Sequence, residues 1–233
     1  MAEEEKDYIN NIFKYESDWN DLFENERFIS ELCSDVLENY IQKQRWFGGK
    51  ASSIKYIDIV DFFKIERDND LFYGIVLEVN FKEAFVQQYF LPMGLVKEKD
   101  YVDHKIISRL DLNGERGYLV DAILLESFRA QIFNKIVEGD KYKYEEVEYR
   151  RGRKCGDNHY ESSKFLNAEQ SNTSIIFNDK YILKFFRRVY TDQNPDYEIS
   201  KYLTDNGFFE NTPGYCGSIT LKFSDKNIMT LAL

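Results

Sequence analysis

The sequence predicts an α+β fold, in which a main helix packs on a curved antiparallel sheet and a smaller unit of a β-hairpin and a helix follows. Apolar residues recur at helical spacing over residues 26–43. Three β-like runs follow over residues 54–63, 72–81 and 84–93, with polar breaks between them. A hairpin pattern and a second capped helix lie near the end of the sequence, which indicates a second unit.

The composition is that of a globular protein. The chain has 233 residues, of which 43% are apolar and 31% charged, enough for one large domain or two small ones. Its formal net charge of −10 argues against nucleic acid as a partner, because a phosphate backbone would be repelled. No apolar run is long enough for a membrane span, and the acidic N-terminus is unlike a signal peptide.

Cysteine usage points to a reducing compartment. Cys33, Cys155 and Cys216 are far apart in the sequence and form no CxxC pair. We therefore expect reduced thiols in a cytoplasmic protein, and we expect no metal site built from these residues.

The first elements can be placed from periodicity and turn signals. The predicted first helix has an apolar stripe formed by Phe28, Ile29, Leu32, Val36, Leu37, Tyr40 and Ile41. Asn113-Gly114 marks a turn between a strand near residues 105–110 and a short run at 118–120. A second amphipathic helix is expected over residues 126–137, and Gly139 is its C-terminal stop.

A change of composition suggests the domain boundary. Residues 141–164 are charged and polar and show no periodicity. We therefore predict a first domain over residues 1–140, a polar linker over 141–164 and a second domain over 165–233. The basic cluster at 150–154 is typical of a solvated linker rather than of a phosphate site.

Lys184 is the first residue that suggests chemistry. In the strand expected over residues 181–186, alternation places Ile182, Lys184 and Phe186 on one face. An ammonium between apolar neighbours must meet an anion or extend out to solvent, so an edge-strand lysine without function is the alternative. The preceding turn, Asn178-Asp179, suits positive φ and therefore fixes the register of the hairpin.

A polar stretch precedes this hairpin and could lie along a phosphate chain. It offers backbone N–H groups and side-chain donors, and its members are Gln170, Ser171, Asn172, Thr173 and Ser174. The stretch contains no glycine, so its signal as an isolated phosphate loop is weak.

Glu198 lies in the first turn of the last predicted helix. Asn194 is a good N-cap, Pro195 suits the first helical position, and Asn206-Gly207 ends the helix. As an alternative, the Glu198 carboxylate could have no function beyond its favourable interaction with the positive end of the helix dipole. Together with Lys184 and the polar stretch, however, it forms the pattern of a kinase-type nucleotide clamp, in which a helix acid holds the strand lysine against the phosphates.

These segments resemble bacterial maltokinase in order and spacing. In the second half, the matching segments are Gln170–Ser174, Leu183–Arg188, Asn194-Pro195, Glu198-Ile199, Leu203-Thr204 and Gly207-Phe208. Upstream, the sequence Gln44-Arg45-Trp46-Phe47-Gly48-Gly49-Lys50 resembles the hallmark of the N-terminal cap in that family. Trp46 in this motif also fits a purely structural role, as an aromatic plug between the first helix and the sheet.

The resemblance implies a cystatin-like cap followed by the start of an N-terminal lobe similar to those of protein kinases and aminoglycoside phosphotransferases. It implies transfer of the γ-phosphate of ATP to maltose, with Mg²⁺, giving maltose 1-phosphate for α-glucan synthesis. It also implies association or fusion with a trehalose synthase. The ATP-binding residues would be Gln170, Ser171, Asn172, Thr173, Ser174, Lys184 and Glu198.

The sequence departs from the family where the second lobe would begin. Residues 227–233 resemble the last strand before the adenine hinge, and no catalytic aspartate, metal ligand or sugar pocket follows. We therefore expect this chain alone to be inactive. A related kinase for another sugar, such as glucosamine, and a non-catalytic module that docks on trehalose synthase are the alternatives.

Overall fold

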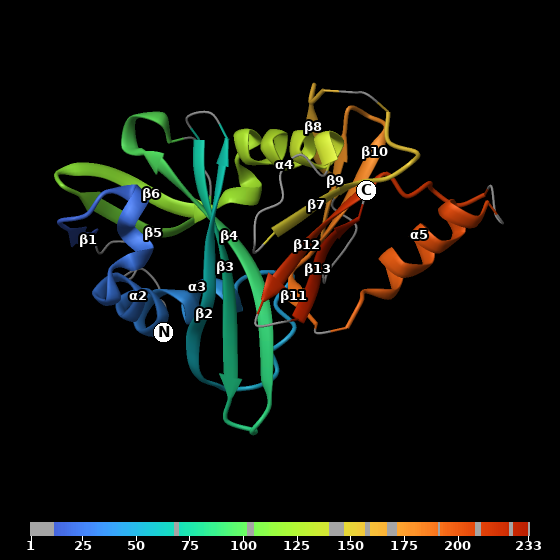
Figure 1. Cartoon of the computed structure of the whole chain (residues 1–233). Coiled ribbons are helices and arrows are strands. Elements are labelled where there is room, and N and C mark those ends of the chain that lie inside the picture. The colour runs from blue at the N-terminus through green and yellow to red at the C-terminus, as the bar shows by residue number, and fades with distance from the viewer. Residues whose placement is uncertain are drawn as a thin grey trace. The chain divides into compact units, whose positions relative to one another are not determined.

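The protein is described by a computed structural model that covers residues 12–67, 70–101, 105–139, 147–156, 159–166, 172–190, 192–207, 211–223 and 226–232. The chain divides into two compact units, Met1–Phe128 and Arg129–Leu233, and each is described by itself (Figure 1). Helices combined with largely antiparallel sheets confirm the predicted α+β class.

The first unit is a sheet with strand order β1-β5-β6-β4-β3-β2. Its strands are β1 (Ile12–Tyr15), β2 (Ile54–Arg67), β3 (Asp70–Phe81), β4 (Val86–Lys97), β5 (Ile106–Leu112) and β6 (Glu115–Asp121). Its helical segments are η2 (Trp19–Glu24), α2 (Glu26–Glu31), η3 (Leu32–Val36), α3 (Leu37–Gln42), η4 (Glu98–Asp100) and η5 (Ala122–Leu124). β1 runs parallel to β5, and the other pairs are antiparallel.

The predicted first helix is present and continuous through α2, η3 and α3. Asn25 caps it, because its side chain accepts a hydrogen bond of 3.1 Å from the backbone N–H of Phe28. The middle segment, η3, is a π-helical turn. The apolar stripe is buried against the sheet as expected, apart from Ile29, which is only partly buried.

The motif at residues 44–50 closes this core. Trp46 lies 5.8 Å from the ring of Tyr89, and Phe47 lies 5.2 Å from the same ring. The Tyr89 hydroxyl accepts a hydrogen bond of 3.2 Å from the backbone N–H of Gly48. A Cβ at Gly49 would collide with the rings of Phe47 and Phe81, so only glycine leaves room for this packing. The structural role predicted for Trp46 is therefore confirmed.

The turn predicted at Asn113-Gly114 joins β5 and β6. Both residues have positive φ, 50° and 88°, as a type I′ turn requires. Asn113 tolerates this conformation better than most residues, and Gly114 adopts it without strain. The predicted hairpin is confirmed.

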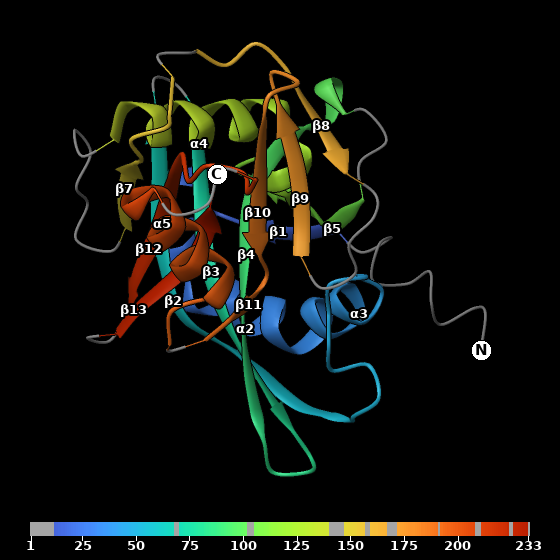
Figure 2. The same ribbon diagram turned by 90° about the vertical axis from the view of Figure 1, so that its right-hand side faces the viewer.

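The second unit is a six-stranded sheet with order β7-β12-β13-β10-β9-β8 (Figure 2). Its strands are β7 (Val147–Arg151), β8 (Ser163–Leu166), β9 (Asn172–Phe177), β10 (Tyr181–Phe186), β12 (Gly217–Phe223) and β13 (Lys226–Ala232), and β11 (Arg188–Val189) is a two-residue strand. Its helices are α4 (Glu126–Glu138), which begins in the first unit, and α5 (Pro195–Asn206).

The unit boundary differs from the predicted one, because most of α4 belongs to the second unit. Phe133 lies 5.0 Å from Phe177 and 5.7 Å from Tyr181, so this part of α4 covers one face of the second sheet. In the first turn, Phe128 packs edge-on against Phe72 of the first unit. The predicted boundary at residue 140 is therefore too late by about one helix.

The predicted linker over residues 141–164 is also partly wrong, because Val147–Arg151 form a strand. Val147 and Tyr149 are buried, while Glu148 and Arg150 lie on the other face and form an ion pair of 2.9 Å. Buried and outward-facing residues thus alternate along this strand, but the charged residues at its outward positions make the segment look like a polar linker in the sequence. Residues 140–146, 157 and 158 lie outside the described residues.

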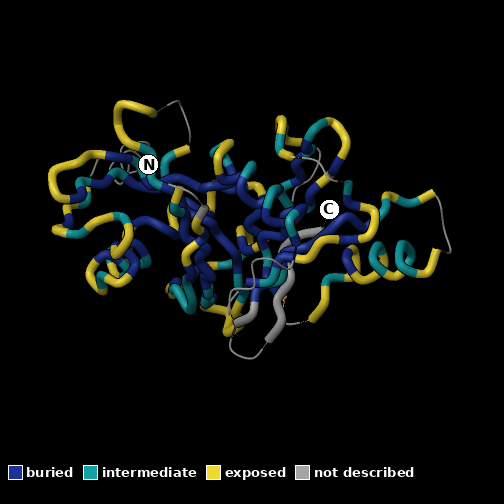
Figure 3. Tube along the Cα trace, turned by 45° about the horizontal axis from the view of Figure 1, so that its top comes forward, coloured by how far each residue is buried: buried dark blue, intermediate teal, exposed yellow. Residues whose placement is uncertain are grey.

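Burial is concentrated in the two sheets and in the helical segments that cover them (Figure 3). The exposed large apolar side chains include Tyr56, Val86, Ile182, Ile199 and Tyr202. Within the described ranges, no helix has the length and apolar character needed to cross a membrane.

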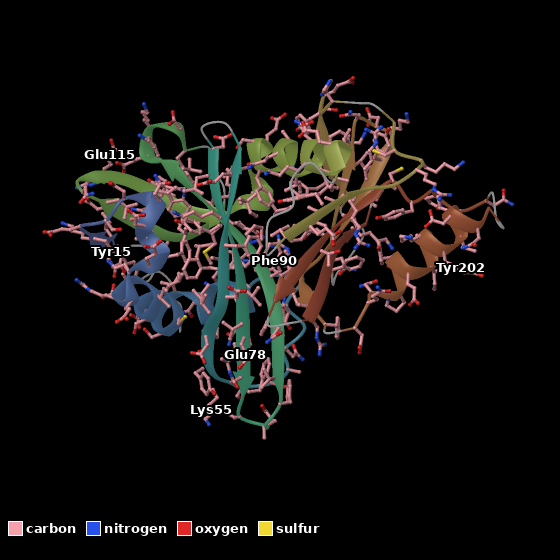
Figure 4. The ribbon with its side chains drawn as sticks, viewed as in Figure 1. Tyr15, Lys55, Glu78, Phe90, Glu115 and Tyr202 are labelled. Atoms are coloured by element: carbon pink, nitrogen blue, oxygen red, sulfur yellow. The ribbon has the colours of Figure 1, made fainter. Side chains whose placement is uncertain are left out.

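A polar network ties β1 to α2. The Tyr15 hydroxyl donates to Glu31 Oε2 at 2.6 Å, and Arg27 Nε donates to Glu31 Oε1 at 2.7 Å. These two bonds hold the pKa of the Glu31 carboxyl below its usual range. Burial, first of all, and the contact with Glu31 raise the pKa of the Tyr15 hydroxyl. Figure 4 labels Tyr15 on β1.

The unit boundary predicts which truncated chain folds. A chain that ends at Phe128 keeps the whole first sheet and its helix, so it should show a cooperative thermal transition. A chain that ends at Gly139 adds Phe133 and Ile136 without Phe177 and Gly217, against which they pack in the second unit, and should bind more of a hydrophobic dye such as ANS. A molten, dye-binding product from the shorter chain would contradict this boundary.

The Tyr15–Glu31 bond predicts a pH effect. Because the pKa of Glu31 is lowered on folding, its contribution to stability is present above the pKa of a free glutamate, about 4.3, and is lost as the pH falls through the lowered value. Tyr15→Phe should therefore reduce the difference between the free energies of unfolding at pH 7 and pH 3. Because the Glu31 side chain is partly exposed and solvent screens its contacts, we expect a change below about 1 kcal/mol. Tyr118→Phe is the matched control, and an unchanged difference in Tyr15→Phe would refute the role of this bond.

Candidate functional site

The residues that suggested chemistry lie on the strands β8, β9 and β10. Directly opposed residues of antiparallel strands share a face of the sheet. Leu166, Ser174 and Lys184 are opposed in one row, and Lys164, Ile176 and Ile182 form the next. Alternation in the sequence had placed Ile182 on the same face as Lys184. The pairing of β10 with β9, and of β9 with β8, adds the residues of those two strands to this face.

The two faces of this sheet differ in how far other parts of the unit bury them. Leu183, Phe185 and Phe177 lie on the face that packs against α4, and all three are fully buried. On the other face, Leu166 is 39% exposed and Ile182 is 47% exposed. We call this second surface the Lys184 face, and it consists of Lys164, Leu166, Asn172, Ser174, Ile176, Ile182, Lys184 and Phe186.

The Lys184 face combines two kinds of contact. Leu166, Ile176 and Ile182 form an apolar patch that a flat ring could cover. Binding of such a ring would be favoured by the free energy gained when apolar surface is removed from water. Lys184 lies in the row of Leu166 and one row away from Ile176 and Ile182, and it supplies an ammonium with three donors. The arrangement can therefore hold a molecule that carries an apolar ring at one end and an anion at the other.

The predicted acid partner of Lys184 is corrected by the structure. Lys184 Nζ donates to Asp196 Oδ2 at 2.9 Å, and these two groups form an ion pair. Glu198 was expected in this place, but its side chain is exposed and forms no hydrogen bond or ion pair within the described part of the chain. The reason is rotational, since residues two positions apart on a helix point in nearly opposite directions.

The helix itself has the predicted ends. The Asn194 side chain accepts a hydrogen bond of 2.9 Å from the backbone N–H of Asp196, and Pro195 occupies the first turn. Gly207 has a φ of 66° and stops the helix in the left-handed conformation. Asp196 is thereby held at a defined position in the first turn.

The polar stretch is only partly within the described residues. Gln170 and Ser171 lie outside them. The stretch was expected to precede the hairpin, but Asn172, Thr173 and Ser174 belong to β9, the first strand of that hairpin. Their side chains alternate between the two faces, because a strand has a period of two residues.

This alternation separates the roles of the three residues. Thr173 points away from the Lys184 face, and its hydroxyl accepts a hydrogen bond of 3.2 Å from buried Arg187. Ser174 is directly opposite Lys184, and Asn172 is opposite Phe186 on the same face. Asn172 and Ser174 are therefore the members of the stretch that share a face of the sheet with Lys184, and Ser174 is buried there.

Some functional candidates were not singled out from the sequence. Leu166 and Ile176 have no chemical signal of their own, and they join the site only through strand register. Asp196 had a signal, an acid in the first turn of a capped helix, but the family pattern favoured Glu198. As for metals, no group of three or more His, Cys, Asp or Glu side chains among the described residues could hold an ion.

Comparisons with known proteins support both halves of this description. Residues 40–124 match the sequence profile of the maltokinase N-terminal cap domain. This confirms the resemblance stated for the motif at residues 44–50 and places the cap in the first unit.

Solved structures with a similar fold include a glucosamine kinase in complex with glucosamine, ADP and inorganic phosphate. It has a TM-score of 0.51 and 11% sequence identity, over 94% of this chain and 40% of that one. A second glucosamine kinase structure has a TM-score of 0.46 and 12% identity, over 76% of this chain and 33% of that one. The chain thus spans about 40% of the length of the first kinase, and the likeness shows a kinase-like fold.

Proposed function

The chain carries a maltokinase N-terminal cap domain at residues 40–124, and from this premise we propose that it is the cap and nucleotide-binding part of a maltokinase. The proposed reaction moves the γ-phosphate of ATP to the anomeric hydroxyl of maltose, which gives maltose 1-phosphate and ADP. The proposal further includes a cytoplasmic location and a role beside trehalose synthase in α-glucan metabolism.

The Lys184 face is the observation that carries the nucleotide part of the proposal. Its apolar patch suits a purine ring, and the Lys184 ammonium beside the patch suits the phosphates of the same molecule. Lys184 would bind phosphate oxygens with charge-assisted hydrogen bonds and would oppose the negative charge of the transferring group. Asn172, which is half-buried on the same face, could add a polar contact, whereas Ser174 is buried.

Phosphoryl transfer from ATP also uses Mg²⁺, which neutralises charge on the β- and γ-phosphates. Because the described residues include no group of three metal-ligating side chains, we assign no residue of this chain to the ion. The acceptor sugar is likewise proposed from the cap domain, and not from a sugar contact in this chain.

Binding of an ATP analogue by the 233-residue chain tests the nucleotide part. Lys184→Met removes the ammonium and should weaken binding on the order of tenfold, as expected for one hydrogen bond to a charged group. Ile182→Ser reduces the apolar patch and should weaken binding severalfold. Lys180→Met is the matched control, because Lys180 is an exposed lysine in the turn of the same hairpin. Equal affinity in Lys184→Met and Lys180→Met would refute the proposed site.

The reaction is tested in the longer enzyme that contains this chain. Lys184→Met should lower turnover about a hundredfold or more, for a lost contact in the transition state worth ~3 kcal/mol. Maltose and glucosamine are offered as competing acceptors, and phosphorylation of glucosamine alone would contradict the maltose assignment. That the 233-residue chain alone forms no maltose 1-phosphate stays a prediction, which the same assay checks.

A further inference from the structure

We propose that a groove in the first unit, between its helix and the strand β2, binds an extended peptide with basic side chains. The groove has a volume of about 700 Å³, and its walls are the helix between Glu26 and Glu38 and the part of β2 between Lys55 and Ile59. The helix lies beside β2 in Figure 1, and Figure 4 labels Lys55 on this strand. This inference goes beyond the proposed function, because it concerns neither the Lys184 face nor a nucleotide.

The strand wall of the groove is the last strand of the sheet. β2 ends the strand order, and in the described part of the chain it pairs only with β3. The backbone N–H of Ile59 interacts with the Cys33 sulfur, so it points away from β3. Because backbone orientation repeats every second residue, the N–H and C=O groups of Ile57 lie on the same side. A peptide in the groove can therefore hydrogen-bond to β2 as a further strand.

Irregularities in β2 limit the length of an added strand. The pairing with β3 shifts register at Lys55 and again at Val60, which is typical of β-bulges. Between these two positions, residues 56–59 form a regular ladder. Bulges at the edge of a sheet disfavour pairing between two long strands. The edge thus suits a short peptide better than it suits β2 of a second copy.

The helical wall is irregular at the same groove. Cys33 and Ser34 line the groove, and both belong to the π-helical turn η3. Such turns are rare and occur frequently at functional sites. From Glu26 to Glu38 the helix rises by about 18 Å, which is the length of about five residues of an extended chain. The groove therefore has the length of a short peptide strand.

The charges of the groove favour basic side chains in the peptide. Glu26, Glu38 and Asp58 contribute three carboxylates, and Glu26 and Asp58 form no hydrogen bond or ion pair within the described residues. Among the described lining residues, Lys55 is the single cation, and its ammonium lies 5.6 Å from the centre of the Tyr56 ring. The groove is thus negative, which attracts lysine and arginine and repels acidic side chains.

The pleat of β2 indicates an alternating peptide. Ile57 and Ile59 face the core beneath the helix, so Asp58 points to the opposite face of the sheet. In an added strand, alternate residues share these two faces. Basic residues therefore suit the face of Asp58, and apolar residues suit the face of the two isoleucines and of Ile29.

A labelled hexapeptide of alternating lysine and valine tests the proposal by fluorescence anisotropy with the 233-residue chain. It should bind saturably, with a dissociation constant below about 1 mM, and more weakly as salt is raised. The same peptide with glutamate in place of lysine should not bind. Absence of saturable binding by the lysine peptide, or equal binding of the glutamate peptide, overturns the proposal.

Variants locate the binding. Asp58→Lys reverses a charge in the groove and should weaken binding about tenfold. Glu66→Lys is the matched control, because Glu66 is an exposed acid of the same strand outside the groove. Ser30→Trp fills part of the groove without a change of charge and should also weaken binding, and thermal melting verifies that each variant is folded. Equal affinity in Asp58→Lys and Glu66→Lys refutes the groove as the site.

N-methylation of the peptide separates strand addition from charge attraction alone. Methyl groups on the amides that face β2 keep the charges but remove hydrogen-bond donors, and they should weaken binding about tenfold. Methyl groups on the alternate amides, which face solvent, should have a smaller effect. Equal affinities of the two methylated peptides overturn strand addition.

Cys33 reports whether the groove is occupied. Its alkylation is followed by peptide mass spectrometry at alkaline pH, because burial raises the pKa of the thiol to about 11. Saturating lysine–valine peptide should slow this reaction but leave the buried Cys155 and Cys216 unaffected. An unchanged rate at Cys33, or a dimer of the chain that the peptide dissociates, overturns the proposal, since the dimer would identify a second copy as the occupant.

Discussion

The candidate site depends on the register between β9 and β10. Asn178, Asp179 and Lys180 join these strands, since Phe177 is paired with Tyr181. Asn178 and Asp179 both have a φ of 51°, and the backbone N–H of Lys180 donates a hydrogen bond of 2.9 Å to the carbonyl of Phe177, which closes a tight turn. A slip by one residue would turn Lys184 to the opposite face, among the aromatic rings beneath α4. An ammonium buried there without an anion would cost several kcal/mol, so the apolar cover of one face also keeps the charge on the other.

The same turn organises the third strand of the site. The Asn178 side-chain oxygen accepts hydrogen bonds from the backbone N–H groups of Glu161 and Ser162, at 2.9 Å and 3.2 Å. These residues lead directly into β8, whose Ser163 is opposed to Phe177. Leu166 therefore reaches the row of Lys184 through contacts that begin at the turn. One asparagine thus bends the hairpin and sets the start of the neighbouring strand.

Local signals in the sequence predicted the parts of the fold that local chemistry determines. Asn25, Asn194 and Gly207 mark helix ends by capping, and Asn113-Gly114 marks its hairpin by positive φ. β1 was not predicted, because four residues give too short a pattern and its partner β5 lies far away in the sequence. β7 was missed because charged residues occupy its exposed positions.

Only part of the site was predicted, because the rest depends on contacts between elements that are separate in the sequence. Lys184 and its neighbour Ile182 follow from alternation within one strand, which a sequence shows directly. The choice between Asp196 and Glu198 depends on how α5 is rotated about its axis, and a buried contact between Tyr197 and Tyr215 decides this. The members from β8 and β9 depend on pairing between strands. Neither kind of information is present in the spacing of residues along one element.

The buried side chain of Tyr197 also limits how α5 can move. Near the other end of the helix, the Thr204 hydroxyl accepts a hydrogen bond of 2.8 Å from the backbone N–H of Tyr215, the residue whose ring packs against Tyr197. The first and last turns of α5 are therefore held by the same residue, so the helix can neither spin about its axis nor swing about one end alone. Any displacement of Tyr215 would carry the whole of α5, and Asp196 with it, as a rigid rod.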